Sequence, residues 1–137
     1  PLLAADQTNE WTEEAILIAA DGRVDAGRGD DALALLTGRS GSAFVAKRCE
    51  VLQKLKRAGE ATGCFAALEA LPGEDGLLQA ADARQRLDEF AASIPLLERA
   101  RERVPDSTEV QYRLASAYER YAFGWADWRF IWGVNGP

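Results

Sequence analysis

Apolar residues recur along much of this chain at intervals of three and four positions, which is the spacing of one face of an α-helix. The pattern is clearest over residues 108–121, where the apolar face comprises Leu114, Ala115, Ala117, Tyr118 and Tyr121. No segment of the sequence shows the strict alternation of a half-buried strand. The sequence therefore predicts an all-α fold.

Glycine, proline and capping residues divide the periodic pattern into eight expected helices. We predict them from Thr12 to Val24, from Asp30 or Asp31 to Thr37, from Ala43 to Arg57, from Ala61 to Leu71, up to Arg86, from Glu89 to Val104, from Thr108 to Tyr121, and over 124–132. Gly59 is expected to end the third helix. Pro95 is expected to bend the sixth helix or shift its start, because a proline beyond the first turn removes a backbone hydrogen bond.

One short pattern occurs three times: a small residue followed, four positions later, by leucine. The pairs are Ala32 and Leu36, Cys64 and Leu68, and Ser93 and Leu97. The copies lie 32 and 29 residues apart. Repetition at this length is typical of solenoids, in which each helical hairpin buries its apolar face against its neighbours. We therefore expect stacked hairpins, whose function depends on surfaces.

The third copy and the segment after it resemble a known repeat family. Residues 94–106 resemble the second helix and exit of a tetratricopeptide repeat, and 110–121 resemble the first helix of the next repeat. The resemblance covers about residues 12–132 and is strongest over 87–121. The small residue that lets the two helices of a repeat approach recurs as Ala20, Ala81 and Ala115, with Leu52 as the departure. The resemblance implies a right-handed superhelical stack of about four hairpins.

Domains of this family are mostly scaffolds that bind peptides or proteins on a concave face lined by first helices. Carried over to this chain, the resemblance implies a non-catalytic scaffold or adaptor. The expected binding residues are Gln53, Lys56, Arg57, Asp82, Gln85, Arg86, Tyr112, Ser116 and Arg120. Arg57, Arg86 and Arg120 would form a ladder across one groove, which would suit an acidic partner.

Composition narrows the expected chemistry. The chain has a net charge of −6 and no histidine, which argues against nucleic-acid binding and excludes histidine-dependent catalysis and histidine metal ligands. We predict no enzyme activity, no catalytic residue, no metal and no cofactor. Asp21, Asp25 and Asp82 are expected to be structural surface carboxylates rather than an acid–base set. No apolar run is long enough to span a bilayer, so no membrane partner is predicted.

The two cysteines, Cys49 and Cys64, are expected on the two arms of a hairpin that turns near Gly59. A turn there places them about 7–8 Å out of step along the helix axes, at a rise of about 1.5 Å per residue. That offset favours two buried thiols over a disulfide. The cytoplasm is the expected compartment and the periplasm is the alternative.

Trp125, Trp128 and Trp132 fall on one stripe of the last expected helix. So much aromatic surface is seldom left exposed. The stripe is expected to cap the end of the stack, to form an interface with a partner or a second copy, or to rest on a membrane surface. Only Arg129 supplies positive charge there, which argues against anionic lipid.

These patterns divide the chain into an N-terminal extension over residues 1–11, a repeat domain over 12–132 and a tail over 133–137. Three alternatives to a peptide-binding scaffold stay open. The chain could serve as an oligomerisation module through the tryptophan stripe, as a helical accessory domain of a larger enzyme, or, least favoured, as a small helical enzyme.

Overall fold

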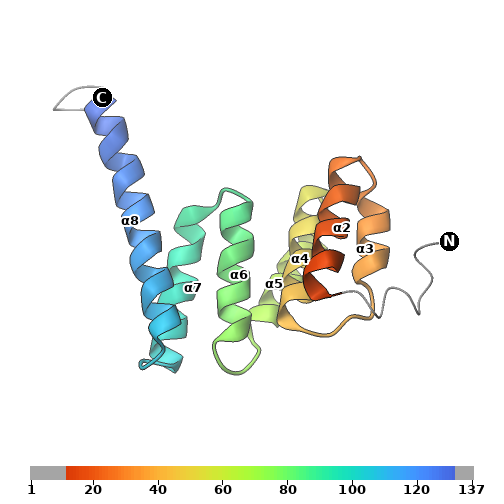
Figure 1. Cartoon of the computed structure of the whole chain (residues 1–137), viewed down its shortest axis with the longest axis horizontal. Coiled ribbons are helices and arrows are strands. Elements are labelled where there is room, and N and C mark those ends of the chain that lie inside the picture. The colour runs from red at the N-terminus through yellow and green to blue at the C-terminus, as the bar shows by residue number, and fades with distance from the viewer. Residues whose placement is uncertain (1–11, 132–137) are drawn as a thin grey trace. The chain divides into compact units, whose positions relative to one another are not determined.

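The computed structural model describes the backbone of residues 12–131 and the side chains of residues 12–121 (Figure 1). All regular secondary structure in this part of the chain is α-helical, which confirms the predicted all-α class. The helices are α2 (Glu13–Asp25), α3 (Gly29–Leu36), α4 (Ser42–Lys54), α5 (Ala58–Glu69), α6 (Asp75–Arg86), α7 (Phe90–Arg103) and α8 (Thr108–Ile131).

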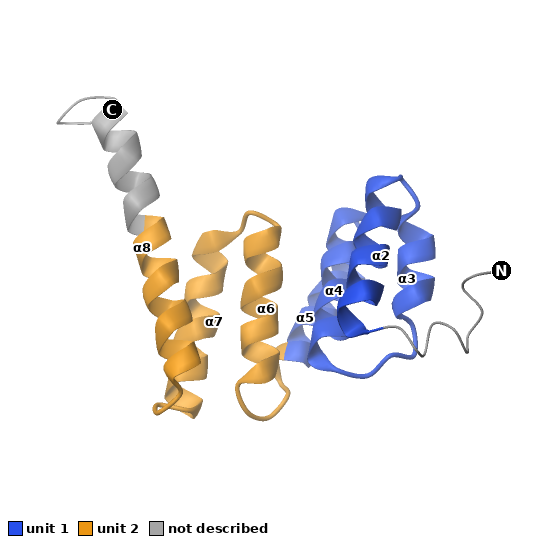
Figure 2. Ribbon diagram, in the orientation of Figure 1, with its two compact units in different colours: residues 1–68 blue, residues 69–137 orange. Residues whose placement is uncertain are grey.

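The chain divides into two compact units (Figure 2): unit 1 comprises residues 1–68 and unit 2 comprises residues 69–137. In unit 1, α2 packs against α3 and α4, and α3 also packs against α4. Its core contains the buried side chains of Ile16, Ala20, Leu36, Phe44 and Val51, among others. In unit 2, α7 packs against both α6 and α8.

The same tight turn joins α2 to α3, α4 to α5 and α6 to α7. The first helix of each pair is followed, after one residue, by a residue with positive φ: Gly27 (77°), Lys56 (64°) and Asp88 (62°). The next backbone N–H donates to a carbonyl five residues earlier, from Arg28 to Arg23, from Arg57 to Leu52 and from Glu89 to Arg84. This is the Schellman arrangement, which satisfies carbonyls that the helix end leaves unpaired.

The three turns set a common register for buried residues. Seven positions before the positive-φ residue the first helices carry Ala20, Cys49 and Ala81, all buried. Five positions after it the second helices carry Ala32, Ala61 and Ser93, which are fully buried. Nine positions after it they carry Leu36, Phe65 and Leu97, which are also buried. The three hairpins therefore repeat the same contact, in which a small residue allows close approach and a large apolar residue fills the space.

This register corrects the predicted alignment of the middle hairpin. The prediction matched Cys64 and Leu68 to the small and large residues, whereas the structure uses Ala61 and Phe65. The counterpart of Ala20 and Ala81 is Cys49, not Leu52. The predicted alignment was shifted because it placed the turn near Gly59, whereas the turn residue is Lys56 and Gly59 lies within α5.

The prediction of two free thiols was wrong, because Cys49 and Cys64 form a disulfide. With the turn at Lys56, Cys49 lies seven positions before it and Cys64 lies eight positions after it. The two cysteines are therefore level across the hairpin, and their Cα atoms are 5.4 Å apart, within the range that a disulfide spans. The disulfide links α4 to α5 inside unit 1.

One helix boundary in unit 2 also differs from expectation. Two helices were expected over 108–121 and 124–132, whereas the single helix α8 runs from Thr108 to Ile131, so Gly124 does not interrupt it. Pro95 lies within α7, which begins at Phe90, close to its predicted start. The N-cap of α2 is Thr12, where the first helix was predicted to start: its side chain accepts a hydrogen bond from the Ala15 N–H at 3.2 Å.

The positive φ at these turns has a testable consequence for the stability of the protein. Replacing Lys56 with glycine is expected to raise the free energy of unfolding by about 0.5–1 kcal/mol, since a side chain is strained in this conformation. Gly27→Ala is the reverse change and should cost about 1 kcal/mol. An alanine Cβ there meets no atom within 4 Å, so its cost is backbone strain alone. Urea unfolding of both variants measures the effects; equal shifts of the same sign would contradict this account.

Candidate functional site

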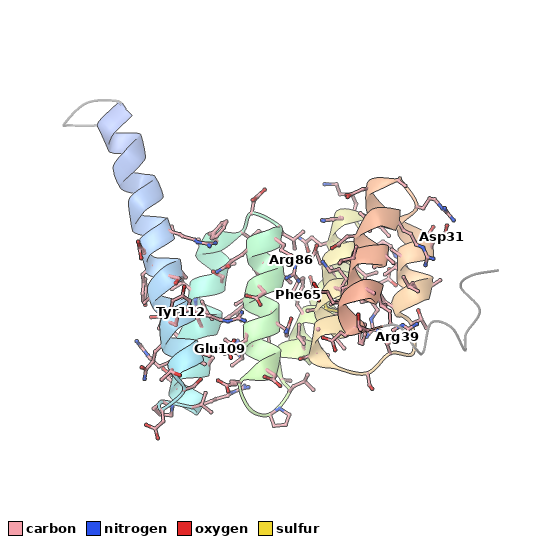
Figure 3. All side chains as sticks on the ribbon, viewed as in Figure 1. Asp31, Arg39, Phe65, Arg86, Glu109 and Tyr112 are labelled. Atoms are coloured by element: carbon pink, nitrogen blue, oxygen red, sulfur yellow. A yellow bond between two sulfur atoms is a disulfide. The ribbon has the colours of Figure 1, made fainter. Side chains whose placement is uncertain are left out.

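A cleft of about 360 Å³ lies among α6, α7 and α8 of unit 2. Its lining residues come mainly from one face of α8, at intervals of three and four. They are Asp82 and Gln85 of α6, Leu97 of α7, and Glu109, Tyr112, Arg113, Ser116, Ala117 and Arg120 of α8. Two of the α8 residues, Glu109 and Tyr112, are labelled in Figure 3.

An ion-pair network fixes one end of the cleft. Arg113 donates from Nη1 to both carboxylate oxygens of Asp82, at 2.5 Å, and from Nη2 to Glu109 at 3.0 Å. Burial opposes the charge of Arg113, but the two carboxylates outweigh this effect and raise the pKa of Arg113 above its ordinary value. The network ties α6 to α8 and leaves one net negative charge at this end.

The opposite end of the cleft is basic. Arg120 lies with its guanidinium 6.0 Å from the centre of the Phe90 ring, a cation–π contact between α8 and α7. Among the described side chains, Arg120 has this aromatic partner and no carboxylate partner. Within that range, the guanidinium N–H groups of Arg120 are not taken up by a carboxylate and can donate to a ligand.

The floor of the cleft is apolar and held in place. Leu97 and Ala117 are both buried. Beside them, Gln85 donates to the hydroxyl of Ser93 at 3.2 Å, and that hydroxyl donates to the carbonyl of Phe90 at 2.7 Å. Tyr112 is 74% exposed at the edge of the cleft. The site thus combines a rigid apolar floor with polar walls, which is the usual composition of a binding pocket.

Five residues predicted from the sequence line this cleft together: Asp82, Gln85, Tyr112, Ser116 and Arg120. Arg86 is the last residue of α6 and does not line the cleft. The four other lining residues were not among the predicted binding residues: Leu97, Glu109, Arg113 and Ala117. The spacing of Glu109 and Arg113, four apart on one helix, indicates an ion pair, but it does not reveal that Asp82 completes the network.

The other predicted binding residues, Gln53, Lys56 and Arg57, belong to unit 1. Arg57 donates to Glu60 at 2.5 and 2.9 Å and lies 3.6 Å from Asp30. The hydrogen bond from Arg57 holds the pKa of Glu60 below its usual range. In the hairpin register the counterpart of Arg86 is Lys54, because each lies two positions before its turn residue. Arg57 instead begins the connection to α5.

A second polar cluster lies inside unit 1. Lys47, only 4% exposed, lies 2.9 Å from Asp21 of α2 and 3.2 Å from Glu50, which is 1% exposed. Lys54 lies 3.2 Å from the other oxygen of Glu50. Asp21 and Asp82 occupy equivalent positions, six before their turn residues, and each is paired with a base on another helix. Each carboxylate therefore takes part in an ion pair between two helices of its own unit.

The tryptophan stripe lies outside the part of the chain whose side chains are described: α8 includes Trp125 and Trp128 in its backbone only, and Trp132 follows it. Within the described residues, no group of histidine, cysteine and carboxylate side chains could hold a metal ion. In the same range, no helix is both long enough and apolar enough to span a bilayer.

No protein-family model, curated protein or solved structure matches this chain. The hairpin register and the cleft of unit 2 are therefore the features that bear on function.

Proposed function

We propose that this protein is a non-catalytic scaffold that binds a peptide segment of a partner protein in the cleft of unit 2. In this proposal the hairpins are degenerate tetratricopeptide-like repeats, stacked in a right-handed superhelix, and α8 supplies the first helix of a fourth repeat. The repeated Schellman turns and the repeated small and large buried residues support that interpretation.

The observation that carries the proposal is the convergence of five predicted binding residues on one cleft. They come from α6 and α8, two helices that α7 and the Arg113 ion pairs hold together. A cleft whose walls are already fixed loses little conformational entropy on binding. The exposed ring of Tyr112 offers the kind of aromatic contact that contributes strongly to protein interfaces.

The disulfide bears on the compartment of this role. Disulfides persist in oxidising compartments and are rare in the reducing cytosol. Cys49 is fully buried, and the cystine occupies the close-contact position of the hairpin. We therefore propose the periplasm or another oxidising compartment in place of the cytoplasm, the compartment expected from the sequence.

Site-specific photocrosslinking tests the proposed function. Tyr112 is replaced with benzoylphenylalanine, which fits its exposed position, and the chain is irradiated in its native cells. We expect a discrete adduct with a partner protein. The same probe at Ile18, which is 63% exposed on α2 of the other unit, serves as the matched control and should give no such adduct.

A second substitution connects the adduct to the cleft. Ser116→Trp places a large ring in the cleft and should abolish the Tyr112 adduct while the helical circular dichroism stays unchanged. No adduct at Tyr112, or an adduct that Ser116→Trp leaves intact, would contradict binding in this cleft.

A further inference from the structure

The two ends of the cleft carry opposite charge. At one end, the two carboxylates of Asp82 and Glu109 share the single guanidinium of Arg113, which leaves a net charge of −1. At the other end, Arg120 contributes +1 and contacts the Phe90 ring. The charges of the lining residues therefore sum to zero, but the negative charge lies at one end of the cleft and the positive charge at the other.

This arrangement disfavours a uniformly acidic ligand, because the acidic end would repel it. A nucleic-acid backbone is disfavoured for the same reason. A ligand that matches the cleft instead carries one positive and one negative group, with the positive group at Glu109 and the negative group at Arg120.

The length of the helix sets the separation of those groups. Glu109 and Arg120 are eleven residues apart on α8, which corresponds to about 16 Å at a rise of about 1.5 Å per residue. An extended chain advances about 3.3 Å per residue, so about five residues span that distance. Between the two ends lie the apolar floor of Leu97 and Ala117 and the hydroxyl of Ser116.

We infer that the cleft selects an extended peptide segment with a basic and an acidic side chain about five residues apart, separated by small or apolar residues. The acidic side chain accepts hydrogen bonds from Arg120, whose plane the Phe90 ring positions. The basic side chain lies against the carboxylates of Glu109 and Asp82. This inference depends on the proposed peptide-binding function and specifies the partner's chemistry.

Selection from random dodecapeptides displayed on phage tests the inference, with the full chain as bait. Enriched peptides are then synthesised with a fluorescent label, and their affinities are measured by anisotropy. We expect enrichment of a Lys or Arg and an Asp or Glu about five positions apart. Arg120→Glu should weaken these peptides at least about tenfold, the effect of losing one charge-assisted hydrogen bond.

Two controls make the test specific. Replacing the peptide's acidic residue with lysine should restore binding to the Arg120→Glu variant, because the charges are then exchanged. Arg101→Glu makes the same charge change at an exposed site on α7 outside the cleft and should leave affinity unchanged.

The outcomes separate this inference from the proposed function. If selected peptides lose binding on Ser116→Trp but lack the charge pair, or bind Arg120→Glu equally well, the inference fails and the cleft remains a peptide site. If no selected peptide is sensitive to Ser116→Trp, both the inference and the proposed function fail.

Discussion

Reduction of the Cys49–Cys64 disulfide is expected to lower the free energy of unfolding of unit 1 by about 3 kcal/mol. The two cysteines are 15 residues apart in sequence, and closing a loop of that length in the unfolded chain is worth about 3 kcal/mol in the chain-entropy model. For a unit of about 70 residues this corresponds to a fall in Tm of roughly 12–24 °C. Calorimetry with and without dithiothreitol measures it.

The hairpin register supplies the control for reduction. Cys49→Ala should be tolerated, since Ala20 and Ala81 occupy the same position in the other hairpins. The double variant Cys49→Ala/Cys64→Ala should unfold near the Tm of the reduced protein and should not respond to dithiothreitol. An oxidised and a reduced protein with the same Tm would show that the disulfide does not stabilise the hairpin.

Lys47→Met is expected to destabilise unit 1 by about 3 kcal/mol, because it removes the one buried positive charge beside the buried carboxylate of Glu50 and leaves the half-exposed Lys54 as its ion-pair partner. Lys47 and Glu50 are both buried, and Lys47 also connects α4 to Asp21 on α2. Asp21 is half-exposed and can be hydrated again, so most of the cost comes from Glu50. Denaturant unfolding monitored by circular dichroism gives the change in free energy.

Lys54→Met is the matched control, because it removes the same charge from the same carboxylate partner at a site that is 38% exposed. Its expected cost is under about 1 kcal/mol, the usual range for an exposed ion pair. Lys47→Met/Glu50→Leu should recover much of the stability lost in the single variant, because no buried charge remains. Equal costs for Lys47→Met and Lys54→Met would show that burial does not control the energy of this network.

Unit 2 contains an ion pair at the position equivalent to Asp21, but there it forms part of the cleft. Asp82 and Arg113 are only partly buried and lie in the wall of the cleft. There the ion pair leaves the second carboxylate, Glu109, accessible to a ligand. A contact that supports packing in unit 1 thus contributes to a candidate binding site in unit 2.

The sequence alone determined that the chain is helical, the approximate limits of most helices and several residues of the cleft. Helix periodicity and capping depend on neighbours within about four positions, as at Thr12 and Ala15. They can therefore be predicted from the sequence without knowledge of the tertiary structure. Tyr112, Ser116 and Arg120 were predicted through the resemblance to the repeat family, and their spacing of four places them on one face of α8.

Only the tertiary structure decided the register of the hairpins and the partners across them. Lys56 and Asp88 adopt the positive φ usually taken by glycine, whereas Gly59 lies inside α5, so local preference misplaced one turn and with it the disulfide. The Arg113–Asp82 pair joins residues 31 positions apart. Such contacts form because helix packing brings distant side chains together, and no local pattern specifies which of them meet.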